Sequence, residues 1–210
     1  MIEEGPDRLL IECGVPINKL MAALDYEIDG ICGCIATHLH KDHCHSPKKL
    51  MDLGISVYGA AEHHRLCYRL KDNQRIGPFH VHTFDCVHDV PCKGFIISTA
   101  SDRLLFAIDT AKFPQVQVPC DIVVVELNHS VAVLDSMVAE GVMDERVAER
   151  IKRTHASDKL CFDFLNSMDL TKCREIHLLH LSKNIDYKRR FDGLFYPIKI
   201  KINGGSNGKE

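Results

Sequence analysis

Short apolar runs alternate with amphipathic stretches along most of the chain. Apolar runs rich in β-branched residues predict strands, and helix-forming residues after a capping residue predict helices. The predicted strands cover residues 8–12, 31–36, 55–58, 79–84, 94–99, 103–108, 122–126, 175–181 and 195–202. The predicted helices cover residues 18–24, 47–53, 60–70, 144–153 and 157–168. This order of elements favours a layered α/β protein.

Several predicted strands lead into polar side chains that carry chemistry. These residues are Thr37 and the His-rich segment 38–43 after strand 31–36, His88 and Asp89 in the loop that follows strand 79–84, Asp109 and Thr110 after strand 103–108, Asn128 and His129 after strand 122–126, and His180, Ser182 and Asn184 at the end of strand 175–181. Binding sites in layered α/β proteins usually lie where strands end and helices begin. The pattern therefore predicts a functional site built from strand ends.

Composition places the chain among ordinary globular proteins. It has 210 residues, of which 45% are hydrophobic and 26% charged, enough for one sizeable core. We expect a single domain over residues 1–202 and a disordered tail of Gly, Ser and Lys over residues 203–210. No apolar run is long enough to cross a membrane and the first residues lack the features of a signal peptide, so we expect a cytoplasmic protein with no membrane association.

Charge and cysteine usage narrow the picture only slightly. The formal net charge of −3 neither indicates nor excludes a protein that binds polyanions, because local basic clusters matter more than the total. The ten cysteines are scattered through strand-like segments without the spacing of a zinc ribbon. We expect reduced thiols that serve mostly as small core residues, with metal binding by Cys32 and Cys34 a minor alternative.

The segment from His38 to His43 holds three histidines and one aspartate. Imidazole and carboxylate groups together suit zinc, manganese or iron. Six residues can serve two ions if the backbone forms a tight loop that directs alternate side chains to different centres. A dinuclear metal site is therefore the first hypothesis, and a solvent-exposed His-rich loop is the alternative.

The motif Thr37-His38-x-His40-x-Asp42-His43, followed by separate His88, Asp109 and His180, resembles that of the metallo-β-lactamase-fold hydrolases. Later segments are similar to the ribonuclease Z and small phosphodiesterase or exonuclease branch, namely Glu126-x-Asn128-His129, Thr154-His155-Ala156-Ser157 and His180-Leu181-Ser182-x-Asn184. The resemblance covers nearly the whole chain. It implies an α/β fold, the four-layer αββα sandwich, with the site at the edge where both sheets open.

The resemblance also implies a division of labour among these residues. His38, His40 and His88 would hold one divalent ion, Asp42, His43 and His180 would hold the second, and Asp109 would bridge the two. The ions would be zinc, with manganese as the alternative, and Asp42 would also orient a hydroxide held between them.

The remaining histidines receive weaker assignments. His155 is expected to contact the phosphate or to protonate the leaving oxygen, with a surface capping residue as the alternative. His129 is either a support for the ligands or part of a turn, and the role of Ser157 stays open. We expect surface or packing roles for His45, His80, His82 and His177, and solvated positions for His63 and His64.

Three functional hypotheses follow. The first is a metal-dependent phosphodiesterase for a cyclic nucleotide or another small nucleotide. The second is a DNA or RNA nuclease, which basic residues would favour if they converge on one face: Lys48, Lys49, Arg65, Arg69, Lys71 and Lys188-Arg189-Arg190. The third is a metal-stabilised module that binds a nucleotide without cleaving it.

The start of the chain departs from the pattern of the family it resembles. Such enzymes usually open with a strand and a Gly/Ser-rich turn, after which a second strand leads into the segment that matches Leu9–Gly14, and here only eight residues precede Leu9. We expect that this opening strand is missing, which would leave an unpaired sheet edge. A homodimer that covers the edge, or a shortened protein with weakened activity, would follow.

Overall fold

The computed structural model describes residues 1–60, 67–181 and 198–202. They form two compact units, which are described separately: unit 1 holds residues 1–84 and 90–101, and unit 2 holds residues 85–89 and those from 102 onward. The single domain over residues 1–202 stays a prediction. The expected tail over 203–210 lies outside the described residues. None of the described helices is long and apolar enough to cross a membrane.

Unit 1 contains a five-stranded sheet in the order β1-β2-β3-β4-β5. Its strands are β1 (Ile2–Glu4), β2 (Asp7–Ile11), β3 (Ile31–Ala36), β4 (Val57–Gly59) and β5 (Tyr68–Arg69). β1 runs antiparallel to β2, and the pairs from β2 to β5 are parallel. The parallel strands β2 and β3 therefore end at the same edge of the sheet.

The short strand β1 directly precedes β2 and was not predicted. Ile2 pairs with Leu9 and Glu4 with Asp7, so three residues suffice for a short antiparallel strand. Gly5, at φ +59°, makes the tight turn that a residue with a side chain would resist. The homodimer stays a prediction.

Three further strands of unit 1 are β6 (Gln74–Ile76), β7 (Phe79–Cys86) and β8 (Cys92–Ser98). They lie in the order β6-β7-β8, and β6 pairs antiparallel with β7. They pack closely against β3: a Cβ atom on Gly33 would lie 3.1 Å from Ile76 Cγ2, and one on Gly77 would lie 2.5 Å from Cys32 Sγ. Two layers of strands therefore meet face to face.

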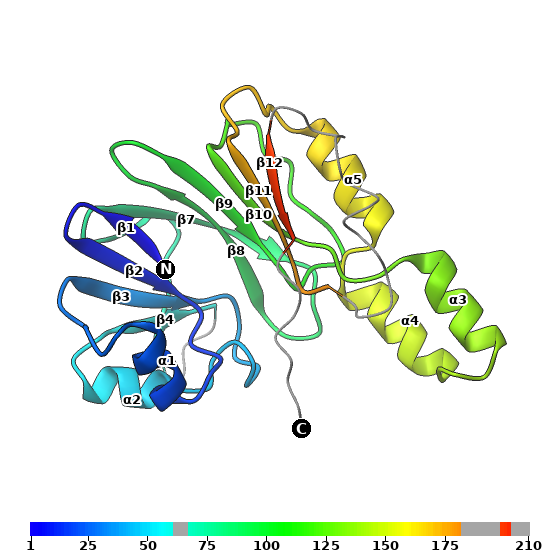
Figure 1. Ribbon diagram of the computed structural model, residues 1–210, viewed down its shortest axis with the longest axis horizontal. Helices are drawn as coiled ribbons and strands as arrows, with labels where there is room; N and C mark the ends of the chain where they lie inside the picture. Colours follow the sequence, from blue (N-terminus) through cyan, green and yellow to red (C-terminus); the bar gives the residue numbers. More distant parts are fainter. Residues whose placement is uncertain (61–66, 182–197, 203–210) are drawn as a thin grey trace. The chain divides into compact units, whose positions relative to one another are not determined.

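Helices α1 (Ile17–Ala23) and α2 (Pro47–Asp52) lie beside the five-stranded sheet, as Figure 1 shows in blue and cyan. A buried apolar cluster joins them to the sheet, with Leu10, Ala36, Leu50 and Val57 in the cluster and Ile17 packed against it. Pro47 begins α2 directly after Ser46, as predicted from the chain.

One predicted helix of unit 1 is wrong in part. Residues 61–66 of the expected helix 60–70, with His63, His64 and Arg65, lie outside the described residues. Tyr68 and Arg69 form β5 instead, paired in parallel with Tyr58 and Gly59 of β4. Pairing with a neighbouring strand outweighed local helix propensity there.

Unit 2 contains four parallel strands in the order β12-β11-β10-β9. These are β9 (Arg103–Ala107), β10 (Ile122–Glu126), β11 (Glu175–Leu179) and β12 (Lys199–Ile202). Val123 and Val125 of β10 are fully buried. A run of β-branched residues is typical of a central strand covered on both faces.

The helices of unit 2 are α3 (Val131–Ala139), α4 (Glu145–Thr154) and α5 (Asp158–Ser167). Asp144 caps α4 by accepting from the backbone N–H of Arg146, and Ser157 caps α5 by accepting from that of Leu160. The predicted starts of these two helices are therefore correct to within one residue. The helix α3, which packs against α4 (Figure 1), was not predicted.

Candidate metal centre

The His-rich segment of unit 1 forms a tight loop directly after β3. The backbone N–H groups of His43 and Cys44 both donate to the carbonyl oxygen of His40, at 3.0 and 2.8 Å. The segment after β2 holds this loop from the side: Cys13 N–H donates to His43 O at 2.9 Å, and His45 N–H donates to Cys13 O at 3.0 Å. The predicted tight loop is therefore present.

His38 and His40 direct ring nitrogens toward each other. His38 Nε2 lies 3.0 Å from His40 Nδ1, and the other nitrogen of His38, Nδ1, lies 2.9 Å from Thr37 Oγ1. His38 is fully buried. A His38 ring that donates its Nδ1–H to Thr37 keeps the Nε2 lone pair for a cation beside His40 Nδ1.

His43 stands between two carboxylates. Its Nδ1 lies 3.4 Å from Glu12 Oε2, and its Nε2 lies 3.5 Å from Asp42 Oδ2. Glu12 also accepts a hydrogen bond from the Thr37 backbone N–H at 3.1 Å. The Asp42 side chain is 72% exposed, whereas Glu12 lies beside Nδ1 of the buried His43 ring.

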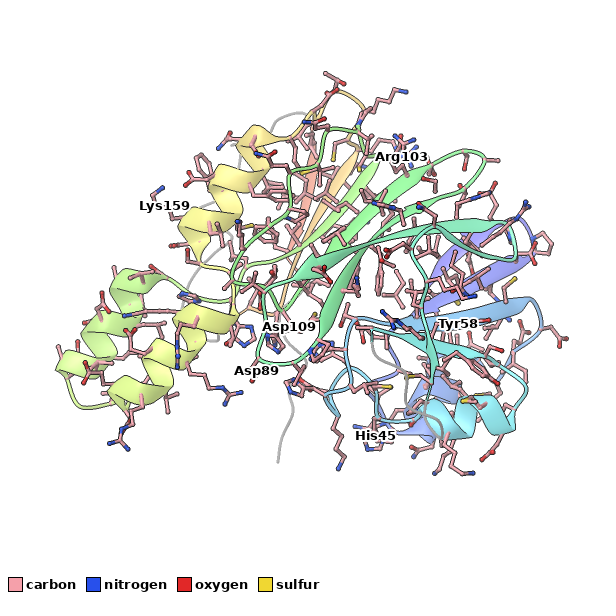
Figure 2. The ribbon with its side chains drawn as sticks, turned by 180° about the vertical axis from the view of Figure 1, so that it is seen from behind. His45, Tyr58, Asp89, Arg103, Asp109 and Lys159 are labelled. Carbon is pink, nitrogen blue, oxygen red and sulfur yellow. The ribbon has the colours of Figure 1, made fainter. Side chains whose placement is uncertain are left out.

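Unit 2 gathers Asp109, Glu126, His155 and His180, whose ligand atoms all lie within 4.8 Å of one another. Asp109 follows β9, Glu126 ends β10, and His180 follows β11. Because these parallel strands end at one edge, the chain delivers three of the four groups to the same place. Figure 2 labels Asp109 in this group, and Asp89 in the loop that carries His88.

Glu126 is the buried centre of this group. Its Oε1 lies 2.7 Å from His155 Nδ1 and 2.8 Å from His180 Nδ1. Its Oε2 accepts backbone N–H groups of Thr110 and Ala156, both at 3.0 Å. Burial alone would raise the pKa of Glu126, but the hydrogen bonds with His155 and His180 lower it. Glu126 is therefore an ionised carboxylate that fixes both rings.

Asp109 contacts the same two rings. Its Oδ1 lies 3.2 Å from His155 Nδ1 and 3.0 Å from His180 Nδ1. Burial would lower the pKa of each histidine, but the hydrogen bonds with Asp109 and Glu126 raise the pKa of His155 to about 9 and that of His180 to about 10. Two carboxylates around two imidazoles make a site that favours positive charge.

His88, in the segment of unit 2 after β7, is held in the same way. Its Nδ1 lies 3.1 Å from the Thr154 carbonyl oxygen, to which it donates, and its Nε2 lies 3.2 Å from Asp89 Oδ1. Its ring meets that of His155 edge to face, with 5.4 Å between centroids. The His88 side chain is 4% exposed.

Asn128 and His129 support this site from the next turn. Asn128 Nδ2 donates to the carbonyl oxygen of His180 at 3.1 Å, which holds the backbone of a candidate ligand. His129 is buried, and its carbonyl oxygen accepts from the Asp158 N–H at the start of α5. Burial lowers the pKa of His129, so its ring is neutral. Ser157 caps α5.

Backbone strain marks the same residues. Glu12, Asp109 and His180 have positive φ angles of 69°, 51° and 62°. Residues with a Cβ atom rarely adopt this conformation, and such strain concentrates at functional sites. Three of the six described non-glycine residues with positive φ therefore belong to the candidate site.

The donor set fits divalent metal ions. In His38, His43, His88 and His180 the Nδ1 atom faces a hydroxyl, carbonyl or carboxylate oxygen. In each ring the Nε2 atom is therefore the one that can bind a cation, the arrangement usual for metal-binding histidines. Within unit 1 the pairs His38–His40 and Asp42–His43 each bring two candidate ligand atoms together.

Sequence reasoning missed the contacts of Glu12 and Glu126. Both lie at the end of an apolar strand, and a carboxylate at the end of a buried run was the available signal. Two predicted site neighbours, Ser182 and Asn184, lie outside the described residues, as does the basic run Lys188-Arg189-Arg190. The exposed positions of His80 and His82 agree with the predicted surface roles. All ten cysteines are free, also as predicted.

No protein-family model and no curated protein sequence matches the chain. Several solved structures do match the chain. The metallo-β-lactamase fold protein YhfI from Bacillus subtilis aligns over 96% of this chain and 86% of its own, with TM-score 0.66 and 16% identity. Zn²⁺-bound PqqB from Methylobacterium extorquens aligns over 98% and 84%, with TM-score 0.67 and 13% identity.

Two further similar structures are enzymes by name. A diphosphatase of the PhnP family aligns over 97% of this chain and 80% of its own, with TM-score 0.63 and 13% identity. The short form of human tRNase Z aligns over 96% and 87%, with TM-score 0.58 and 13% identity. The chain therefore has the metallo-β-lactamase fold, which confirms the predicted α/β fold class.

Proposed function

We propose that this protein is a metal-dependent phosphodiesterase of the ribonuclease Z-like branch of the metallo-β-lactamase fold. The observation that carries the proposal is the orientation of the candidate ligands. Nδ1 of His38, His88 and His180 hydrogen bonds with an oxygen, and Nδ1 of His43 lies 3.4 Å from one, so that Nε2 is the atom left for a metal ion. The fold, and the PhnP-family diphosphatase and tRNase Z among its structural neighbours, support the reaction class.

The assignment of metal ligands follows the resemblance to the metallo-β-lactamase-fold hydrolases. His38, His40 and His88 would hold one ion, Asp42, His43 and His180 would hold the other, and Asp109 would contact both. The ions are zinc or manganese. Bound divalent ions lower the pKa of a water and stabilise the phosphoryl oxygens on which charge accumulates. Asp42, with its exposed carboxylate, would accept a hydrogen bond from such a water and orient it.

His155 acts on the leaving group. Its Nδ1 is held by Glu126 at 2.7 Å and by Asp109 at 3.2 Å, so its Nε2 is the atom that can face a substrate. A histidine held in this way can protonate the oxygen that departs from phosphorus, and the buried carboxylate stabilises the charged ring. The contact of Glu126 with His155 and His180 links the proton donor to a metal ligand.

The substrate is a small phosphodiester, with a cyclic nucleotide as the first choice. A nuclease is the second candidate, supported by the exposed basic residues Lys48, Lys49, Arg69 and Lys71. A nucleotide-binding module without turnover is the third. The protein acts in the cytoplasm and needs no membrane.

Hydrolysis assays with zinc and with manganese test the proposal. The panel consists of cyclic mononucleotides, dinucleotides and short labelled DNA and RNA. We expect cleavage of a small phosphodiester that stops on chelation and changes little with salt. Cleavage of long strands with steep salt dependence would favour the nuclease. Binding without cleavage of any compound, in metal-loaded protein, would favour the binding module.

A further inference from the structure

A cavity of about 340 Å³ lies in unit 1 between the segment Pro16–Asn18 and the segment His45–Lys49. The second of these segments directly continues the His-rich loop, because His45 comes two residues after His43. Ligand pockets for small molecules begin at about 300 Å³. The cavity therefore has room for one compact molecule and not for a folded nucleic acid.

Part of the cavity lining is apolar. Pro16, Ile17 and Pro47 line it. Pro47 is buried and Ile17 packs against the apolar core cluster of unit 1. Two proline rings and a half-buried isoleucine offer a preformed apolar surface, which suits a flat ring that loses little of its own freedom on binding.

The rim of the cavity is basic. Lys48 and Lys49 line it and no lining residue is acidic. Lys48 pairs with Asp52 at 2.9 Å. Lys49 is exposed, and across residues 1–60, 67–181 and 198–202 no carboxylate pairs with it. An ammonium group without a carboxylate partner among the described residues, in a cavity with apolar lining, favours a ligand that carries negative charge.

His45 and Asn18 are polar residues of the lining. Ser46 Oγ donates to the carbonyl oxygen of Val15 at 2.7 Å, and His45 Nδ1 lies 3.2 Å from the same Oγ. Since the Ser46 hydroxyl has only one proton, His45 donates to it through Nδ1. A histidine ring and an amide therefore line the cavity together with the lysines.

We infer that this cavity binds a nucleoside monophosphate group, with the base against Pro16, Ile17 and Pro47, and the phosphate at Lys49. The inference goes beyond the proposed function: a cyclic nucleotide has a single phosphate, so the nucleotide bound here is a second molecule and not the substrate of the metal centre.

Isothermal titration of the full-length protein with adenosine monophosphate, adenosine and inorganic phosphate tests the inference. Titrations are made before and after chelation, because a phosphate that binds only to metal ions is released by chelation and one held by Lys49 is not. We expect the nucleotide to bind in both states and at least about tenfold more tightly than adenosine or phosphate alone, since charge-assisted contact and ring burial add.

Three variants connect binding to the cavity. Lys49→Glu should weaken nucleotide binding about tenfold or more. Asn18→Trp, at an exposed position, should block binding by filling the cavity. Lys71→Glu makes the same charge change on an exposed residue of unit 1 that does not line the cavity, and should bind like the unaltered protein. Thermal unfolding of each variant confirms that it folds.

Four results would overturn the inference: no binding after chelation, adenosine bound as tightly as the nucleotide, phosphate bound as tightly as the nucleotide, or Lys49→Glu bound like Lys71→Glu. Failure of the proposed function has a different signature. A protein that cleaves no phosphodiester but binds the nucleotide after chelation retains the cavity and loses only the reaction.

Discussion

At the residue scale, individual carboxylates fix the positions of the other side chains in the candidate centre. Glu126 is fully buried and accepts hydrogen bonds from two rings and two backbone N–H groups. A buried carboxylate is stable only when its oxygens are satisfied, and here each oxygen has two partners. Glu126 therefore sets the positions of His155 and His180 more strictly than packing could.

Glu126→Gln should reduce turnover by about 10- to 100-fold, the usual cost of losing a group that orients a metal ligand. The amide keeps the size of the side chain but removes its charge. Metal content and the kcat are measured together. Glu175→Gln is the matched control, since it removes a carboxylate that contacts a histidine of the same unit, His177, at 2.9 Å. Equal turnover in the two variants would contradict the role of Glu126.

Gly14 matters for a steric reason. A Cβ atom there would lie 1.5 Å from the carbonyl oxygen of Asp42 and 2.6 Å from the backbone nitrogen of His43. Gly14→Ala should therefore displace the metal loop and lower both metal content and thermal stability. Gly141→Ala is the control, because its Cβ would meet nothing within 4 Å and only the positive φ of 70° opposes it, at about 1–2 kcal/mol. A Gly14→Ala protein with full metal content would show that the loop tolerates displacement.

At the scale of elements, regular patterns were predictable and long-range pairing was not. Strands β3 and β10 were predicted with their observed ends, because an apolar run bounded by polar residues marks both ends. The strand β5 was predicted as helix, since its pairing with β4 involves residues ten positions apart that no local pattern connects. The strand β1 was missed because three residues carry too little pattern.

In the candidate site, too, local groupings of residues were predictable and long-range contacts were not. His38, His40, Asp42 and His43 were predictable because they are close in sequence and share one loop. The grouping of Asp109 with His180 was predictable only through a resemblance. Their contact depends on the parallel register of β9, β10 and β11, and register follows from packing that the sequence does not state. The contacts of Glu12 and Glu126 with these residues were found only in the structure.

The strand pair β11–β12 carries a charge contact that responds to acid. Glu175 Oε2 accepts from Lys201 Nζ at 2.7 Å. The hydrogen bonds with Lys201 and then His177 lower the pKa of Glu175 to about 2. A carboxylate with a lowered folded-state pKa stabilises the fold above its unfolded value near 4.5 and loses this contribution as the pH falls toward 2.

The free energy of unfolding of Glu175→Gln should therefore decrease less between pH 4.5 and 2 than that of the unaltered protein. Free energies of unfolding from urea titrations at several pH values measure this. The effect is small, because the ion pair is partly exposed and screened by solvent. Glu140→Gln, on a carboxylate that accepts from the Ser136 hydroxyl instead of a lysine, is the comparison. Parallel pH profiles for Glu175→Gln and the unaltered protein would contradict the assignment.

The whole molecule should depend on its metal ions for stability as well as for turnover. Ions that bind the folded state and not the unfolded chain raise the free energy of unfolding in proportion to the logarithm of their concentration over Kd. We therefore expect about two ions per chain by elemental analysis, and a lower Tm together with lost hydrolysis after chelation.

Asp109→Ala separates a bridging role from an ordinary ligand role. If Asp109 contacts both ions, its removal leaves each ion one ligand short and should reduce the metal content below one ion per chain. His82→Ala, at an exposed histidine that contacts Asn73, should keep both ions and the original Tm. Retention of one tightly bound ion in Asp109→Ala would show that Asp109 serves a single ion. Retention of both ions would show that Asp109 is not a ligand. Its role would then be to balance the charge of His155 and His180, whose Nδ1 atoms lie 3.2 and 3.0 Å from Asp109 Oδ1.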